Sequence, residues 1–106
     1  MARGVVDLMD ALDKANDDYA KARGRHANAK ADYERVRLTA IAKSTAKSAA
    51  AKAAEAEHMA MAEKLDLIRA EAMAEITQTH VRVLLGELVA AQSVQKFAGK
   101  MDGGDW

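Results

Sequence analysis

One carboxylate and one imidazole are spaced to share a helical face. Glu55 and His58 form a single Glu-x-x-His motif, and di-iron bundles carry this motif twice, with further inward glutamates from two other helices. The apolar seam predicted for the first half of the chain contains no carboxylate that could complete such a cage. A ferritin-like metal-binding bundle is therefore only a third hypothesis, and we expect neither a metal nor another cofactor.

No other pattern predicts catalysis. The chain of 106 residues has no cysteine, and thus no thiol nucleophile or disulfide framework. Its serines and histidines lack an elbow motif, and it has no Gly-rich phosphate loop. We therefore expect a protein that is not an enzyme and has no small-molecule substrate.

Basic side chains are concentrated around the middle of the chain. The candidates for phosphate contact are Arg35, Arg37, Lys43, Lys47 and Lys52. At the tip of a helical hairpin these side chains would bind nucleic acid in a salt-dependent way, although no aromatic residue is interleaved for stacking on single strands. Architectural nucleic-acid binding is the alternative function, and a solvated turn is the other interpretation of the same residues.

Three large apolar residues near the end of the sequence are candidates for binding a protein partner. Val94 and Phe97 lie in residues 89–98, which extend beyond the start of the first helix in the register derived below. Trp106 follows an acidic, Gly-rich segment and is similar to a short peptide that inserts one aromatic side chain into a partner's pocket.

A long helix must position the first half of these residues. Apolar and aromatic residues follow alternating spacings of three and four through Val5, Leu8, Leu12, Ala15, Tyr19, Ala22, His26, Ala29, Tyr33, Val36 and Ala40. Five uninterrupted heptads predict a coiled-coil helix over about 4–42. Gly24 lies off this seam, where it weakens the helix without breaking it.

A second apolar series predicts a second helix over about 48–98. It runs through Met61, Leu65, Ile68, Ala72, Ile76 and Thr79, then through Val81, Leu84, Leu85 and Leu88 after a change of register. Ser and Thr residues cluster at 44–48, so we expect a turn at about 43–47 with Ser44 or Thr45 as the next N-cap. Because no Gly or Pro marks this turn, one continuous helix is the competing prediction.

Charge favours the hairpin. Residues 19–53 carry a net charge of +7 and residues 54–87 a net charge of −4. Folding the chain back near residues 46 and 47 pairs basic with acidic residues and apolar with apolar ones. The pairs are Arg37 with Glu55, Lys30 with Glu63, Arg23 with Glu71, Ala22 with Ala72, and Leu8 with Leu85. The prediction is all-α: an antiparallel two-helix coiled-coil hairpin over residues 1–98, followed by a flexible tail over residues 99–106.

Composition predicts that the hairpin needs partners. Half of the residues are apolar, but 25 of them are Ala and aromatics make up only 4%. Two Ala-rich helices bury little area, so we expect hairpins to pack into an oligomeric bundle. No apolar stretch reaches the ~20 residues of a membrane span, and the N-terminal residues lack a signal peptide's apolar middle. These features predict a cytoplasmic protein that does not enter membranes.

Four segments of the sequence resemble a group of phage proteins. They are Asp17-Asp18-Tyr19, Ala31-Asp32-Tyr33-Glu34, Lys43-Ser44-Thr45, and the run from Leu84 to Ser93. The pattern is similar to small helical-hairpin proteins of unknown function encoded by tailed bacteriophages, often among replication and recombination genes. The resemblance implies a phage-encoded interaction or adaptor protein in the host cytoplasm, acting on a phage or host protein in DNA metabolism or counter-defence.

Overall fold

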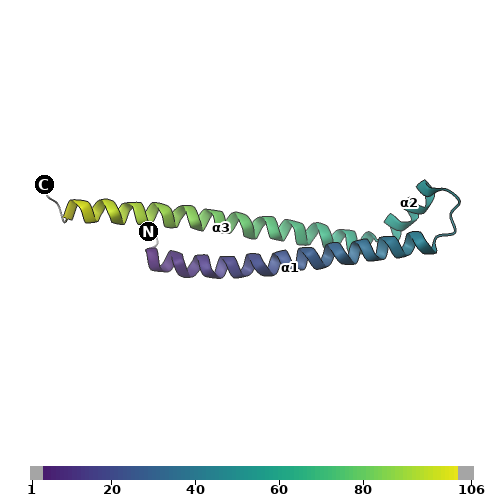
Figure 1. The fold of residues 1–106 in the computed structure, drawn as a ribbon, viewed down its shortest axis with the longest axis horizontal. Coiled ribbons are helices and arrows are strands. Elements are labelled where there is room, and N and C mark those ends of the chain that lie inside the picture. Colours follow the sequence, from purple (N-terminus) through teal and green to yellow (C-terminus); the bar gives the residue numbers. More distant parts are fainter. Residues whose placement is uncertain (1–3, 103–106) are drawn as a thin grey trace. The chain divides into compact units, whose positions relative to one another are not determined.

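The computed structural model describes residues 4–102 and is helical almost throughout that range. Helix α1 spans Val5–Lys43, α2 spans Ala49–Met59 and α3 spans Met61–Asp102 (Figure 1). No strand occurs between residues 4 and 102, which confirms the all-α class. The contacts divide the chain into two units. The first unit contains the described parts of 1–19 and 76–106, and the second contains Ala20–Glu75.

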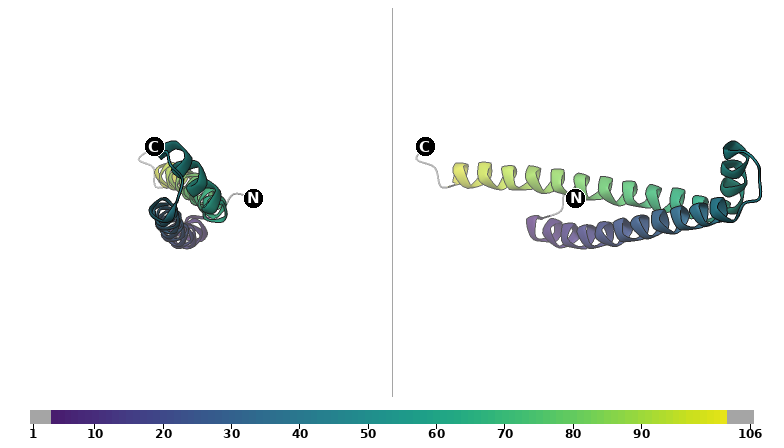
Figure 2. Two further views of the ribbon diagram at one scale, coloured as in Figure 1. Left: turned by 90° about the vertical axis from the view of Figure 1, so that its right-hand side faces the viewer. Right: turned by 45° about the vertical axis from the view of Figure 1, so that its right-hand side comes forward.

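The first unit has a small apolar core between the start of α1 and the second half of α3, which lie side by side (Figures 1 and 2). Leu8 and Ala15 of α1 and Leu84 of α3 are each 2% exposed and form its centre. The partly buried side chains packed against them are Ala11, Leu12, Val81, Leu88 and Ala91. The predicted partner of Leu8 was wrong, because Leu84 is buried there and Leu85 remains 49% exposed.

The second unit is built around small residues. Ala22 of α1, Ala56 of α2 and Ala74 of α3 are buried, and so is Ala60 between α2 and α3. Side chains of this size allow helix backbones to approach closely.

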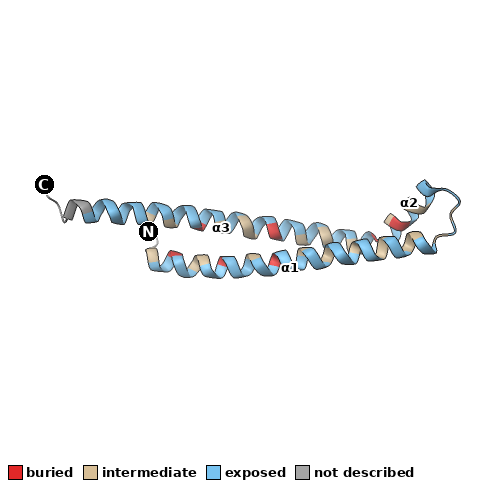
Figure 3. Cartoon of the chain, viewed as in Figure 1, coloured by how far each residue is buried: buried red, intermediate tan, exposed pale blue. Residues whose placement is uncertain are grey.

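The predicted seam of α1 coincides with its inward face. All eleven predicted seam positions between Val5 and Ala40 are buried or half-buried, whereas Gly24 is exposed. Figure 3 shows buried and half-buried segments recurring at intervals along α1. A Cβ atom built on Gly24 would meet nothing within 4 Å. The heptad pattern therefore identified which residues of α1 face its neighbours.

The first half of α3 has a different register from the predicted one. The predicted inward residues Met61, Leu65 and Ile68 are 46–52% exposed, and Ile76 is 62% exposed. The residues that turn inward are Glu63, Leu67, Ala70 and Ala74. The first half of α3 therefore has two series of residues at helical spacing. The series with the smaller residues packs against the other helices, because Ala lets helix backbones approach closely. Ala72, predicted to face Ala22, is exposed.

The N-cap of α2 lies in the connection after α1 and is not one of the two predicted residues. Ser48, in an extended conformation, is the N-cap of α2, and its Oγ accepts a 3.0 Å hydrogen bond from the Ala51 amide. Ser44 cannot serve as that cap, because its Oγ accepts from the Ala46 amide and donates to Glu55 Oε2 at 2.8 Å. The turn thus lies at 44–48, one residue later than predicted.

The predicted second helix is two helices, and its end was placed too early. α2 ends at Met59 and α3 begins at Met61, with Ala60 at φ −96° and ψ 15° between them. The Ala60 amide still donates to the Ala56 carbonyl at 2.9 Å, so the joint is a local bend and not a loop. α3 continues through Gly99 to Asp102, and no glycine in the described range adopts the positive φ of a helix-ending cap. The remainder of the predicted tail, with Trp106, lies outside the described residues.

Candidate interaction surface

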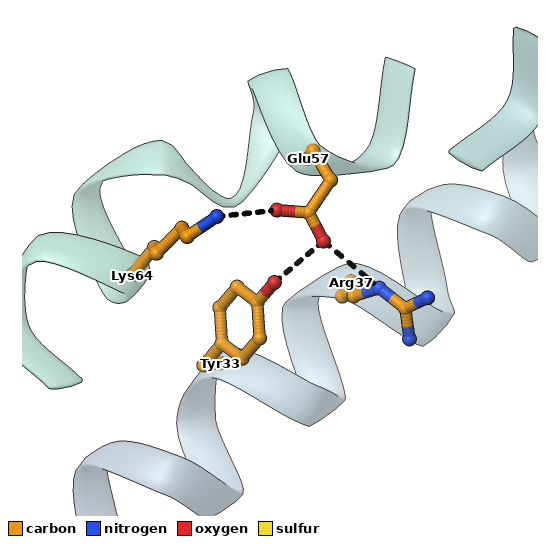
Figure 4. Close-up of polar contacts among 4 residues, drawn as sticks. All are labelled: Tyr33, Arg37, Glu57 and Lys64. Atoms are coloured by element: carbon orange, nitrogen blue, oxygen red, sulfur yellow. Dashed lines mark hydrogen bonds and ion pairs between the residues drawn. The ribbon is translucent and has the colours of Figure 1, made fainter. Parts of the chain in front are cut away.

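A cluster of four polar side chains connects the three helices of the second unit (Figure 4). Tyr33 Oη donates to Glu57 Oε1 at 2.5 Å, and Arg37 Nε donates to the same oxygen at 3.1 Å. Lys64 Nζ donates to Glu57 Oε2 at 3.3 Å. The three donors come from α1 and α3, and the carboxylate comes from α2. One carboxylate with three donors fixes the position of α2 against its neighbours.

The cluster shifts the pKa values of its two acids in opposite directions. The hydrogen bond from Tyr33 lowers the pKa of Glu57 below its ordinary 4.5, and Lys64 and Arg37 add to this effect. The same hydrogen bond raises the pKa of Tyr33 above its ordinary 10.0, because the phenolate would face the Glu57 carboxylate. The shifts stabilise a neutral phenol bound to a charged carboxylate.

Sequence reasoning did not find this cluster. It paired Arg37 with Glu55, but Arg37 binds Glu57 and Glu55 accepts from Ser44. The predicted ion pair of Lys30 with Glu63 does not form at Glu63 Oε2. This oxygen is buried and accepts no hydrogen bond from residues 4–102. The signal that could have revealed the cluster is the i, i+4 spacing of Tyr33 and Arg37 on one face of α1.

The five candidate residues for nucleic-acid binding all lie in the second unit, and two of them contact carboxylates. Arg37 binds Glu57, and Arg35 Nη2 lies 3.5 Å from Asp32 Oδ1. Lys43 and Lys47 are exposed, while Lys52 is half-buried in α2. A groove of about 370 Å³ contains Arg35 and Lys43 but also Glu55, with Val36, Thr39, Ala40 and Met59 as its other lining. The structure therefore places a mixed-charge groove at this end of α1.

Among the residues that the structure describes, none completes a metal site with Glu55 and His58. Within the described range, no group of three or more His, Cys, Asp or Glu side chains is arranged to hold a metal ion. His58 is exposed, and Glu55 is engaged by the Ser44 hydroxyl. Among the described helices, none combines the length and apolar character needed to cross a membrane.

The outward side of α3 carries the largest set of exposed apolar residues. We define the outer face of α3 as the eleven exposed residues Met61, Leu65, Ile68, Ala72, Ile76, Thr79, Val83, Gly86, Ala90, Val94 and Phe97. Successive members are three or four residues apart, so they share one side of a single continuous helix. The inward residues of α3 fall between them in sequence (Figure 3).

Two of the three partner-binding candidates belong to this outer face. Val94 is 68% exposed and Phe97 is 65% exposed. Sequence reasoning missed the first half of the face because it assigned Met61, Leu65 and Ile68 to the hairpin seam. Contiguous exposed apolar patches often mark sites that bind a protein, a membrane or a ligand.

No protein-family model matches this sequence, and comparisons with curated proteins and with solved structures likewise found no match.

Proposed function

We propose that this chain is a non-enzymatic, oligomeric helical protein whose outer face of α3 binds other proteins. One observation carries the proposal: the side of α3 opposite its packed face exposes seven large apolar residues, each 46–68% accessible to solvent. The cost of leaving so much apolar surface in water is removed when a partner covers it. The polar cluster of the second unit supports a structural role, because the Glu57 carboxylate already accepts from three donors.

We also propose that the chain folds as one antiparallel hairpin. The apolar core of the first unit and the polar cluster of the second support this, since each brings α1 together with a later helix. Cysteines at Leu8 and Leu84, which lie in one buried cluster, should then form a disulfide within one chain. Cysteines at Ala22 and the exposed Ala72 should not. Disulfides that form only between chains would instead indicate a long antiparallel dimer.

The proposed function is tested by affinity capture from the natural host, with the bound proteins quantified by mass spectrometry. The test variant combines Val94→Asp and Phe97→Asp on the outer face. The control combines Gln92→Asp and Gln95→Asp, which add the same charge at exposed positions outside that face. We expect specific partners, including untagged copies of the chain, to be lost with the test variant and retained with the control. Equal capture by both variants would contradict the proposal.

Nucleic-acid binding is the alternative, and Lys43 and Lys47 are the exposed residues that favour it. Fluorescence anisotropy with labelled single- and double-stranded DNA at low ionic strength would measure it directly. Affinity that falls with added salt and with Lys43→Gln plus Lys47→Gln would support this alternative. The setting of a phage-encoded protein acting in DNA metabolism or counter-defence in a host cytoplasm depends on the sequence resemblance alone.

A further inference from the structure

We propose that a second copy of this chain packs antiparallel against the outer face of α3, with a two-fold axis at Thr79. This inference rests on the proposed function and names the first partner of the same face. It is carried by three properties of that face: its apolar register, its flanking charges and its small residues.

The apolar register is self-complementary. When two copies of α3 are placed antiparallel with Thr79 opposite Thr79, every member of the outer face meets another member of that face. The cross-helix pairs are Met61 with Phe97, Leu65 with Val94, Ile68 with Ala90, Ala72 with Gly86, and Ile76 with Val83. Residues matched across a two-fold axis in this way make an isologous interface, which closes as a dimer and leaves no open end.

The charges beside the face agree with the same register. On one flank Glu75 comes opposite Arg82 of the second copy, and on the other flank Arg69 comes opposite Glu87. The two-fold axis repeats each pair, so the dimer contains four such pairs of opposite charge. In a parallel, in-register dimer, a residue on one flank would instead lie near the residue five positions later on the opposite flank of the partner. Arg82 would still meet Glu87, but Lys64 would meet Arg69 and bring like charges together. The flanks therefore favour the antiparallel orientation, although each exposed pair adds little affinity.

Small residues near the axis permit close approach. Ala72, Thr79 and Gly86 occupy the central positions of the outer face. Gly86 has no local explanation, because it lies inside α3, has no positive φ, and a Cβ atom there would meet nothing within 4 Å. Glycine in a helix interior is unfavourable by itself. A neighbouring helix packed closely against this position explains its presence.

Cysteine substitution tests the orientation, because the natural chain contains no cysteine and gives no background. Thr79→Cys should form a disulfide-linked dimer under mild oxidation, since the two copies of this residue meet at the axis. Ala72→Cys and Ala90→Cys should not link to themselves, whereas a mixture of Ile68→Cys and Ala90→Cys chains should link to each other. Linkage of Ala72→Cys and Ala90→Cys chains to themselves as fast as Thr79→Cys would show a parallel or unspecific association and overturn the proposal.

Sedimentation equilibrium of the purified chain tests the association itself. The 11.4 kDa chain should have twice that mass at about 100 µM, well above a micromolar dissociation constant. Ile76→Asp should weaken the dimer at least about 100-fold, because it places a charge in an apolar interface. Glu75→Arg should weaken it, and Glu75→Arg with Arg82→Glu should restore it, because the pair is only exchanged.

The two proposals fail differently. A monomer at about 100 µM overturns the self-pairing. If host capture still depends on Val94 and Phe97, the function as a protein-binding surface stands and the partner is another protein. Both proposals are overturned if the chain is a monomer and the variant changed at Val94 and Phe97 captures the same host proteins as the natural chain.

Discussion

Two adjacent leucines of α3 distinguish the structural register from the one that the sequence predicts. Leu84 is 2% exposed and lies in the core with Leu8, whereas Leu85 is 49% exposed. Truncating a buried Leu to Ala costs about 2–5 kcal/mol. The first unit has few buried neighbours around Leu84, so its surroundings can relax, and we expect Leu84→Ala to cost about 2–3 kcal/mol. Leu85→Ala removes side-chain groups that are only half-buried and should cost about 1 kcal/mol or less.

Urea unfolding followed by circular dichroism at the helical band measures both costs. The variants must be compared at one protein concentration, because self-association stabilises the folded chain by mass action. Leu85 lies outside the outer face of α3, so its variant is a matched control for general effects of a Leu truncation in this turn. A larger loss for Leu85→Ala than for Leu84→Ala would refute the structural register and restore the pairing of Leu8 with Leu85.

Three further predictions concern the second unit and α1. Because Glu57 has a lowered pKa and Tyr33 a raised one, the cluster stabilises the fold between about pH 4.5 and 10. That stabilisation is lost as pH falls through the folded-state pKa of Glu57 or rises through that of Tyr33. Glu57→Gln should lower the pKa of Tyr33, which is measured by titrating its tyrosinate absorbance. Ser48→Ala should lower the free energy of unfolding by about 0.5–2 kcal/mol in a thermal melt, because α2 loses its N-cap. Thr45→Ala, which removes no cap, should lower it less. Gly24→Ala should stabilise α1 by about 1 kcal/mol in the same assay, since the added methyl group meets nothing within 4 Å, and a loss of stability would contradict this.

The sequence was informative about α1 because one face of that helix has an unbroken apolar series, and the apolar residues outside it are scattered. The seam from Val5 to Ala40 has a single consistent heptad pattern, so the inward residues could be read directly. α3 has apolar residues on two sides, and hydrophobicity alone cannot say which side packs inside the chain. The prediction chose the larger residues at Met61 and Ile68, but close helix packing in the second unit uses Ala instead.

Sequence could not decide which of two similar residues takes each role in the connection between the helices. Ser44 and Ser48 are equally good N-caps by type, and only the hydrogen bond from Ser44 to Glu55 removes Ser44 from that role. The bend at Ala60 has no sequence signal, because Ala is the best helix former. The choice of Glu57 over Glu55 as the partner of Arg37 likewise depends on how α2 is oriented, which charge counting cannot reveal.

The nested order of the two units along the chain has a consequence for how the protein folds. The side-chain hydrogen bonds that connect α1 and the turn after it to α2 in the second unit join residues 11 to 24 positions apart, whereas the core of the first unit joins Leu8 to Leu84 from near the two ends of the sequence. Because closing a short loop costs less chain entropy than closing a long one, the second unit should assemble first and shorten the effective loop for the first. Substitutions at Leu8 or Leu84 would then act mainly on the rate of unfolding, and those around Glu57 on the rate of folding. The start of α1 and the second half of α3 would be the last segments to join and the first to separate.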